Sequence, residues 1–317
     1  MSSFTRGVTN VDDLLTSTMD IYRSKLTEQW KTATPMLKGM KLVDVDGGND
    51  IVENFEYQGN STSGFVSKTS TVSTTIPQIL TQGTFRFGWL TGSVGIQDFE
   101  EAQNNGKEAM LNLLETRIQN LKDKMKIDTE TALGQASTPN ANYFWSLPDI
   151  VDSGNPTLGN YGDIDRNTYS WWQAYEFASG SMALQGLEDM RLAHLTTSRD
   201  YTDPVDTILM TRTLFLAYQG RLTANEMFVS NKKGDLEFEH LSFMGVPIFP
   251  CGSLNTGLCI GYNSKYMELR INKHLKFKNQ PFVRAPGGQS KSSLIQTQGQ
   301  LVCVRPASNF KLTGMTA

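Results

Sequence analysis

The strongest constraint on the fold of this chain is the contrast between two neighbouring segments, residues 51–84 and 97–133. The first is long and rich in Ser, Thr and Gly, so it can form β-structure but has few side chains to bury. The second carries apolar residues three or four positions apart, which predicts one long amphipathic helix. An isolated two-stranded arm is marginal in water and needs a further surface to cover it. The contrast therefore favours a protein that assembles with other subunits over a self-contained enzyme.

The first segment is expected to form a β-hairpin. Phe55 and Tyr57 alternate with polar residues, a turn-forming cluster follows at residues 59–64, and a return strand is expected over residues 65–72. Disorder is the alternative, because long segments of this composition inside compact folds are either functional or disordered.

A second strand is expected at residues 84–89, and the long helix is expected to begin at Asp98 as N-cap. Gly134 suits the left-handed residue that ends a helix. The aromatic residues of the strand share one face, and we expect them in the core: Phe85, Phe87 and Trp89.

Beyond residue 138 the pattern indicates a mixed α/β region followed by strands. A short strand at 207–210 lies between helical patterns around residues 184–195 and 212–221. The later strands are expected at these positions: 236–243, 245–249, 258–262, 266–271 and 300–305.

Composition narrows the function classes. The net charge of −3 gives no bulk attraction to nucleic acid or to acidic membranes. No apolar run approaches the length of a transmembrane helix, and the N-terminus lacks the pattern of a secretory signal. The three cysteines have no metal-like spacing, so we expect reduced, buried thiols: Cys251, Cys259 and Cys303.

The N-terminal 50 residues begin with a helical pattern that Asn10 or Asp12 can cap. Its apolar residues recur at helical spacing and predict an arm that lies against another surface: Leu14, Leu15, Met19 and Tyr22. An ordinary first helix that packs on its own domain is the alternative.

Three local passages stand out in this order of elements: DIDRNTYSWW at 163–172, LSFMGVPI at 241–248 and GQLVCVRP at 299–306. Together with the arm, hairpin, long helix and α/β region, they resemble tailed-bacteriophage major capsid proteins of the HK97 fold. The resemblance covers nearly the whole chain. It implies an α+β fold with an N-terminal arm, an extended E-loop hairpin, a spine helix in a peripheral (P) domain, and an α/β axial (A) domain.

The resemblance also implies domain boundaries. They are the N-terminal arm 1–52, the E-loop hairpin 53–84, the P-domain with its spine helix 85–137, the A-domain 138–258, and the return strands of the P-domain 259–317.

The implied function is that of a major capsid protein, not an enzyme. Copies would self-assemble into pentamers and hexamers that form the icosahedral head shell around phage double-stranded DNA, without sequence-specific binding. The expected partners are other copies, a scaffolding protein, a portal protein and, where one is used, a decoration protein. No cofactor, metal, catalytic residue or membrane is expected. The protein would be assembled in the host cytoplasm and reside in the virion head.

Inter-subunit contacts are expected from the arm residues named above and from the hairpin. The hairpin residues are Phe55, Tyr57, Gly59, Gly64, Phe65 and Lys68. Some relatives crosslink an E-loop lysine to a neighbouring asparagine, and Lys68 is the only lysine of this hairpin. An exposed strand residue is the simpler expectation for it.

Two other classes of function compete with assembly. A carbohydrate-active enzyme, or a carbohydrate-binding phage tail protein, could use Asp163 and Asp165 as paired carboxylates beside the aromatic rings of Trp171 and Trp172. Two aspartates two positions apart in a loop are more often turn-formers or caps. The three histidines fit no zinc motif, and no nucleophile-elbow or phosphate-loop motif occurs.

Overall fold

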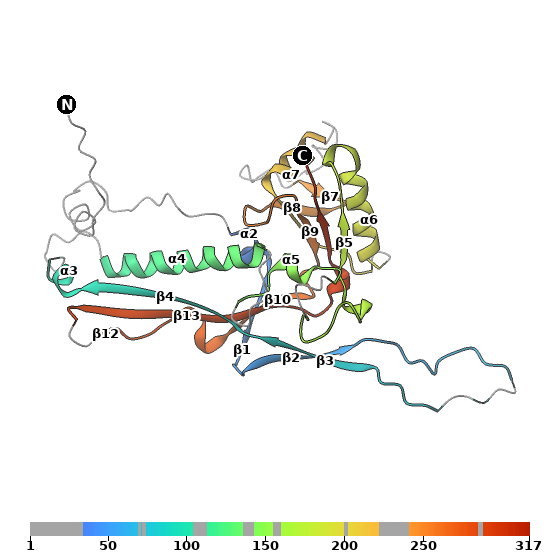
Figure 1. Cartoon of the computed structure of the whole chain (residues 1–317), viewed down its shortest axis with the longest axis horizontal. Coiled ribbons are helices and arrows are strands. Elements are labelled where there is room, and N and C mark those ends of the chain that lie inside the picture. The colour runs from blue at the N-terminus through green and yellow to red at the C-terminus, as the bar shows by residue number, and fades with distance from the viewer. Residues whose placement is uncertain are drawn as a thin grey trace. The chain divides into compact units, whose positions relative to one another are not determined.

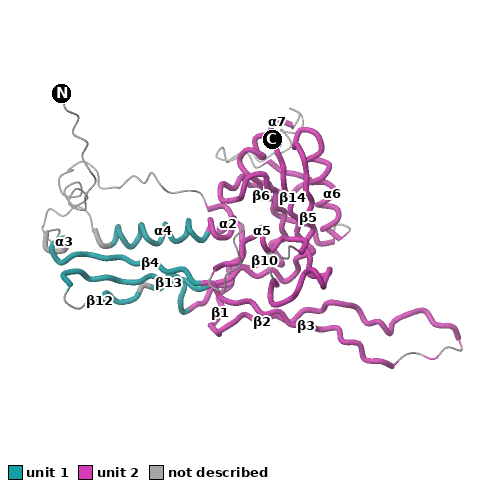
Figure 2. The backbone as a smooth tube through the Cα atoms, in the orientation of Figure 1, with its two compact units in different colours: residues 1–33, 89–129, 274–298 teal, residues 34–88, 130–273, 299–317 magenta. Residues whose placement is uncertain are grey.

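The computed structural model of the chain describes residues 34–68, 71, 74–103, 113–135, 143–154, 160–199, 202–221, 241–284 and 288–317. The arm helix predicted around Leu14, Leu15, Met19 and Tyr22 lies outside these residues. Two compact units divide the chain (Figure 2). Unit 1 comprises residues 1–33, 89–129 and 274–298, and unit 2 comprises residues 34–88, 130–273 and 299–317.

Unit 1 combines a helix with a sheet built on one long strand. Its elements are β4 (Gly88–Gln97), α3 (Asp98–Gln103), α4 (Leu113–Gly134), η4 (Lys273–Leu275), β11 (Lys278–Asn279), β12 (Val283–Arg284) and β13 (Ser290–Cys303), of which β4, α4, η4 and β13 continue into unit 2. β13 pairs with β4 and runs antiparallel to β11 and β12.

One face of the unit 1 sheet is covered by α4. A Cβ added to Gly92 of β4 would lie 2.7 Å from the Leu121 side chain of α4, so the strand and the helix are in close contact. Along β13, Ser293 and Ile295 are buried, whereas Leu294 between them is exposed. This alternation is typical of a sheet with one covered and one open face.

Unit 2 contains a mixed sheet with strand order β5-β14-β9-β6-β8-β7. Its strands are β5 (Tyr175–Ala178), β6 (Thr207–Met210), β7 (Ser242–Phe243), β8 (Val246–Pro250), β9 (Cys259–Tyr262) and β14 (Phe310–Thr313). The helices of this region are α5 (Leu147–Ile150), η2 (Ser170–Trp172), η3 (Met182–Gly186), α6 (Leu187–Thr197), α7 (Arg212–Arg221) and η5 (Pro306–Ser308).

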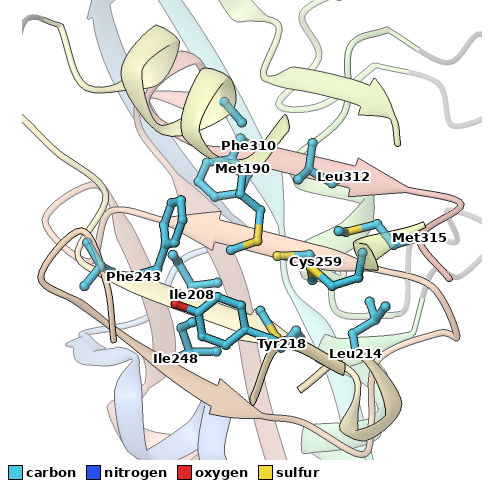
Figure 3. Close-up of a cluster of buried hydrophobic side chains, with 14 of the residues drawn as sticks. Met190, Ile208, Leu214, Tyr218, Phe243, Ile248, Cys259, Phe310, Leu312 and Met315 are labelled. Atoms are coloured by element: carbon cyan, nitrogen blue, oxygen red, sulfur yellow. The ribbon is translucent and has the colours of Figure 1, made fainter. Parts of the chain in front are cut away.

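The main core of unit 2 lies between this sheet and its two longer helices. Met190 of α6 and Leu214 and Tyr218 of α7 point toward strand residues such as Ile208 and Phe310 (Figure 3). All five side chains are at most 2% exposed. Burial of this apolar surface is the dominant favourable term in the folding of the unit.

The close approach of β9 to β14 provides a direct test of this packing. Phe310 lies opposite Gly261 in the register, and a Cβ at Gly261 would lie 2.2 Å from the Phe310 ring. We expect Gly261→Ala to lower the free energy of unfolding by about 1–3 kcal/mol, since the ring must leave its position. Urea denaturation measures the change.

Gly220→Ala in α7 is the matched control: no atom lies within 4 Å of the added Cβ, so it should stabilise the protein slightly. Equal effects of the two substitutions would contradict the packing.

A hairpin root and a small helix complete unit 2. α2 (Pro35–Gly39) leads into β1 (Lys41–Val45), and β1 pairs in parallel with β10 (Met267–Asn272), which pairs with the end of β13. β2 (Asp50–Glu56) and β3 (Leu80–Arg86) form a separate antiparallel pair (Figure 1).

The hairpin differs from the prediction in its register. β2 pairs with β3, and the described residues between 57 and 79 contain no strand. The return strand predicted at 65–72 is therefore wrong for residues 65–68 and 71, and its residues 69, 70 and 72 lie outside the described residues. The aromatic strand predicted at 84–89 supplies part of the return instead. It breaks at Phe87, which is buried with Phe85, but Trp89 is 50% exposed and does not belong to the core.

The long helix is described in two parts, α3 and α4, and residues 104–112 between them lie outside the described residues. Gly134 is the last residue of α4 and does not adopt the predicted left-handed conformation. A Cβ there would lie 2.7 Å from the Met36 methyl carbon and 2.8 Å from Ser253, so this glycine permits close packing. β4 occupies residues where only a connection was expected.

Further along the chain, β6 and α7 lie where the pattern placed them. β8, β9 and β10 match the predicted strands within two residues, and β13 begins ten residues before the predicted strand at 300. Of the strand predicted at 236–243, only β7 falls within the described residues. β9 and β14, in the segment 259–317 expected to return to the P-domain, instead pair within the sheet of the α/β region.

Candidate assembly site: the hairpin and its root

The connection between β2 and β3 is long, extended and largely uncovered. It is tied at its base, where the Tyr57 amide donates to the Ile79 carbonyl (3.1 Å) and the Tyr57 hydroxyl to the Gln78 carbonyl (2.7 Å). Farther out it continues beyond both strands (Figure 1). Three apolar side chains of its described residues are exposed: Phe65 (111% exposed), Val66 (59%) and Ile76 (93%).

Of the hairpin residues that were predicted to contact a neighbour, four are exposed and two are buried or half-buried in their own subunit. Gly59, Gly64, Phe65 and Lys68 are exposed in the connection. Phe55 is only 6% exposed and packs on Trp172 of its own subunit, with ring centroids 4.7 Å apart, so its role as an inter-subunit contact stays a prediction. It fills the inner face of β2 because it follows the buried Ile51 at the strand spacing. Tyr57 is half-buried near Trp171, at 5.7 Å.

An aromatic cluster anchors the root of the hairpin to unit 2. Phe85 of β3 packs on Tyr161 at 5.0 Å, and Tyr161 stacks on Trp172 at 5.8 Å. The Trp172 indole N–H donates to the Tyr161 carbonyl (2.8 Å), and this hydrogen bond fixes the position of the Trp172 ring beside Tyr161. Aromatic pairs at these separations contribute beyond their buried area. The cluster therefore fixes the root while the connection remains uncovered.

Gly162 makes this anchoring possible. Its φ of +64° lies in the left-handed region, and a Cβ there would lie 2.8 Å from the Phe85 ring. Its carbonyl accepts a hydrogen bond from the Thr84 amide (3.0 Å). The residue after Tyr161 thus has to be glycine for the loop to reach β3.

The polar groups at the centre of the cluster are structural. The Tyr161 hydroxyl accepts from the Cys303 amide (2.7 Å), and burial raises the pKa of Tyr161 well above its ordinary value. The Arg166 guanidinium lies 4.9 Å from the Tyr161 ring centroid and donates to the Asp149 carbonyl (2.7 Å). Burial lowers the pKa of Arg166.

The acid pair of the enzyme alternative lies in a hydrogen-bonded turn. Asp165 accepts from the Asn167 amide (2.9 Å) and the Thr168 hydroxyl (2.6 Å), and these hydrogen bonds, that of Thr168 first, lower its pKa. A glycosidase general acid needs a raised pKa. Asp163 occupies a turn with φ 61°, and Trp172 is 1% exposed and cannot receive a sugar. Both aspartates belong to the turn that presents the aromatic cluster.

The described residues contain no group of three or more His, Cys, Asp or Glu side chains that could hold a metal ion. Within the same residues, no helix is long and apolar enough to cross a membrane. The three cysteines are unpaired and buried, as predicted, and burial raises the pKa of Cys259 and of Cys303 to about 12. These thiols are therefore unreactive at neutral pH.

A second uncovered surface lies on unit 1. The sheet face opposite α4 carries three exposed apolar side chains: Trp89 (50% exposed), Val283 (63%) and Leu294 (43%). Val283 pairs with Ser292 in the register, which places it on the same side of the sheet as Leu294. We call these three residues the open face of unit 1.

Comparison with known proteins identifies the fold. No family model and no curated protein matches the sequence. Among solved structures, the capsid of cyanophage A-1(L) matches with a TM-score of 0.68 at 13% identity, covering 93% of this chain and 96% of that one. The capsid of a native GTA particle matches with 0.65 at 12% identity (94% and 95%). The SrpI encapsulin of Synechococcus elongatus matches with 0.60 at 11% identity (97% and 96%). The predicted α+β, HK97-like capsid fold is confirmed over nearly the whole chain.

Proposed function

We propose that this protein is a major capsid protein whose copies associate into pentamers and hexamers and close an icosahedral shell around phage double-stranded DNA. One observation carries the proposal: the connection between β2 and β3 is long, and its apolar side chains Phe65, Val66 and Ile76 are exposed on their own subunit. Such a segment suits contact with another copy, because main-chain and side-chain groups left free in one subunit can be satisfied by the next. The HK97-like fold of the chain agrees with this role.

In this proposal β2, β3 and their connection are the E-loop, and α4 is the spine helix of the P-domain. The sheet of β5, β6, β8, β9 and β14 is the core of the A-domain. The P-domain return is then narrower than residues 259–317, because β9 and β14 belong to the A-domain sheet. The scaffolding protein, the portal protein, any decoration protein and assembly in the host cytoplasm belong to the same proposal.

The open face of unit 1 is the surface that the connection of a neighbouring copy would cover. It presents Trp89, Val283 and Leu294 among polar side chains, and the connection presents Phe65, Val66 and Ile76 among hydroxyl groups. A contact between two different surfaces is heterologous and can close into rings. Burial of these six apolar side chains would favour association.

Electron microscopy of the expressed protein tests the proposal. Produced alone and together with a scaffolding protein, the chain should form capsomers or closed shells in negative stain. Light scattering on the same samples measures the fraction in particles. A protein that stays monomeric under all these conditions contradicts the proposed function.

A further inference from the structure

The inner face of β2 breaks the pattern that its neighbours set. Ile51 and Phe55 are 4% and 6% exposed, and Glu53 lies between them on the same face. A strand that packs one face on a core is expected to be apolar at each inward position. A charged residue at the central inward position therefore calls for a reason other than core packing.

Glu53 is paired with Arg270 of β10. The same guanidinium also donates to the Glu268 carboxylate from Nη2 (3.2 Å) and from Nε (3.3 Å). Glu268 in turn accepts from Nζ of Lys41 on β1, at 2.6 Å. Four charges of alternating sign thus connect β2 to β10 and β1, and we call them the root bridge. The side chains of Arg270 and Glu268 are only 13% and 14% exposed.

Such a bridge fixes the relative orientation of the strands that it joins more than it stabilises the fold. The desolvation of partly buried charges offsets much of their attraction, so ion pairs of this kind are weak evidence for stability. A planar guanidinium held between two carboxylates, in contrast, fixes geometry, because its donors point in set directions. The aromatic cluster at the same root supplies apolar burial, which is non-directional.

We propose that Arg270 is a positioning residue that sets the orientation of the hairpin on its own subunit. With the root bridge formed, β2 and β3 leave the body of unit 2 at one angle, and the connection 57–79 is presented to the next copy in one place. Without the bridge, the aromatic cluster still holds the root, but the hairpin samples a range of angles. The consequence for assembly rests on the proposed function; the consequence for the isolated subunit does not.

The test replaces both partners by apolar residues of similar length, E53M with R270M, which leaves Glu268 paired with Lys41. Spin labels at two introduced cysteines, S61C in the connection and E188C on α6, report the hairpin orientation; the buried native cysteines stay unlabelled. We expect an unchanged denaturation midpoint, a broadened distance distribution, and particle formation reduced about tenfold. The exchanged pair, E53R with R270E, puts a guanidinium on β2 within reach of two carboxylates on β10, that of Glu268 and the introduced one. It should narrow the spin-label distance distribution again.

The control is K124Q with D128N, which removes the exposed Lys124–Asp128 pair of α4. It should change neither the denaturation midpoint, nor the distance distribution, nor particle formation.

The outcomes separate the inference from the proposed function. A wild-type chain that forms no particles contradicts the proposed function, while the distance distributions still test the bridge. A wild-type distribution in the E53M and R270M double variant overturns the inference. So does a double variant that fails to fold, since the bridge would then be a source of stability.

Discussion

A chain from which residues 59–77 are removed should fold with the stability of the full-length protein and form no particles. The deleted segment lies between Gln58 and Gln78, above the hydrogen bonds that tie Tyr57 to the base of the connection. Phe65 and Ile76 in this segment contribute nothing to the core of the subunit, because they are 111% and 93% exposed. Assembly should fall by about a hundredfold or more, since burial of two or three large side chains per contact contributes several kcal/mol. Denaturation in urea and negative-stain microscopy measure the two quantities.

A full-length variant separates the loss of contacts from the loss of chain length. Phe65, Val66 and Ile76 are all replaced by Ser, which keeps the connection and removes its apolar groups. We expect the same loss of particles with an unchanged midpoint of unfolding. Wild-type shells from either variant would contradict an assembly role for the connection. A large loss of subunit stability in either one would show that the segment serves its own fold.

The regular parts of the fold were predictable because they carry local signals. β6 is a short apolar run that lies between two helical patterns, and α7 has the apolar spacing of a helix packed on one face. A hairpin was predicted, but not which two segments of the chain pair in it. Residues 65–72 alternate as a strand does, yet the described ones among them, 65–68 and 71, form no strand, whereas β3 pairs with β2 through Phe85 and Ile51. Alternation alone cannot identify which run a strand will pair with.

The first part of β13 escaped prediction because most of its residues are polar. Residues 290–298 are rich in Ser and Gln and give no clear strand signal, and their pairing with β11, β12 and β4 makes them a strand. β14 was missed for a different reason. It is four residues long, and its partners β5 and β9 are far away in the sequence. Such pairings are decided by tertiary packing.

The site was predictable only in outline. The exposed connection follows from its composition, but its anchor does not. The passage at 163–172 was notable as a resemblance, and its role as the turn that presents Trp172 to Phe55 depends on contacts that no spacing encodes. Glu53 offered the one readable signal. It is a charge between Ile51 and Phe55 on the inward positions of a strand, and a local rule broken in this way often marks a functional site.

Trp172→Ala should have the largest effect on the stability of the subunit. The side chain is 1% exposed and lies against Phe55 and Tyr161, with its N–H donating to the Tyr161 carbonyl. Its removal leaves a cavity and takes one of two donors from the buried Tyr161 carbonyl, which keeps only the Ile164 amide at 3.3 Å. We expect a loss of about 3–5 kcal/mol in the free energy of unfolding. Urea denaturation measures the loss, and hydrogen exchange should show faster exchange in β2 and β3, because the root loses its main apolar contact.

Trp171→Ala is the matched control, one residue away in the same turn. Its ring is partly exposed, and its indole N–H makes no hydrogen bond to the described residues. It contacts Tyr57 and Tyr169 at the margin of the cluster, at 5.7 and 6.2 Å. We expect a loss of about 1 kcal/mol or less. If the two substitutions cost the same, burial in the cluster would not be what holds the hairpin root. If Trp172→Ala alone is severe, the part of the hairpin that folds within the subunit ends at the cluster, and the connection beyond it is left for a neighbouring copy to cover.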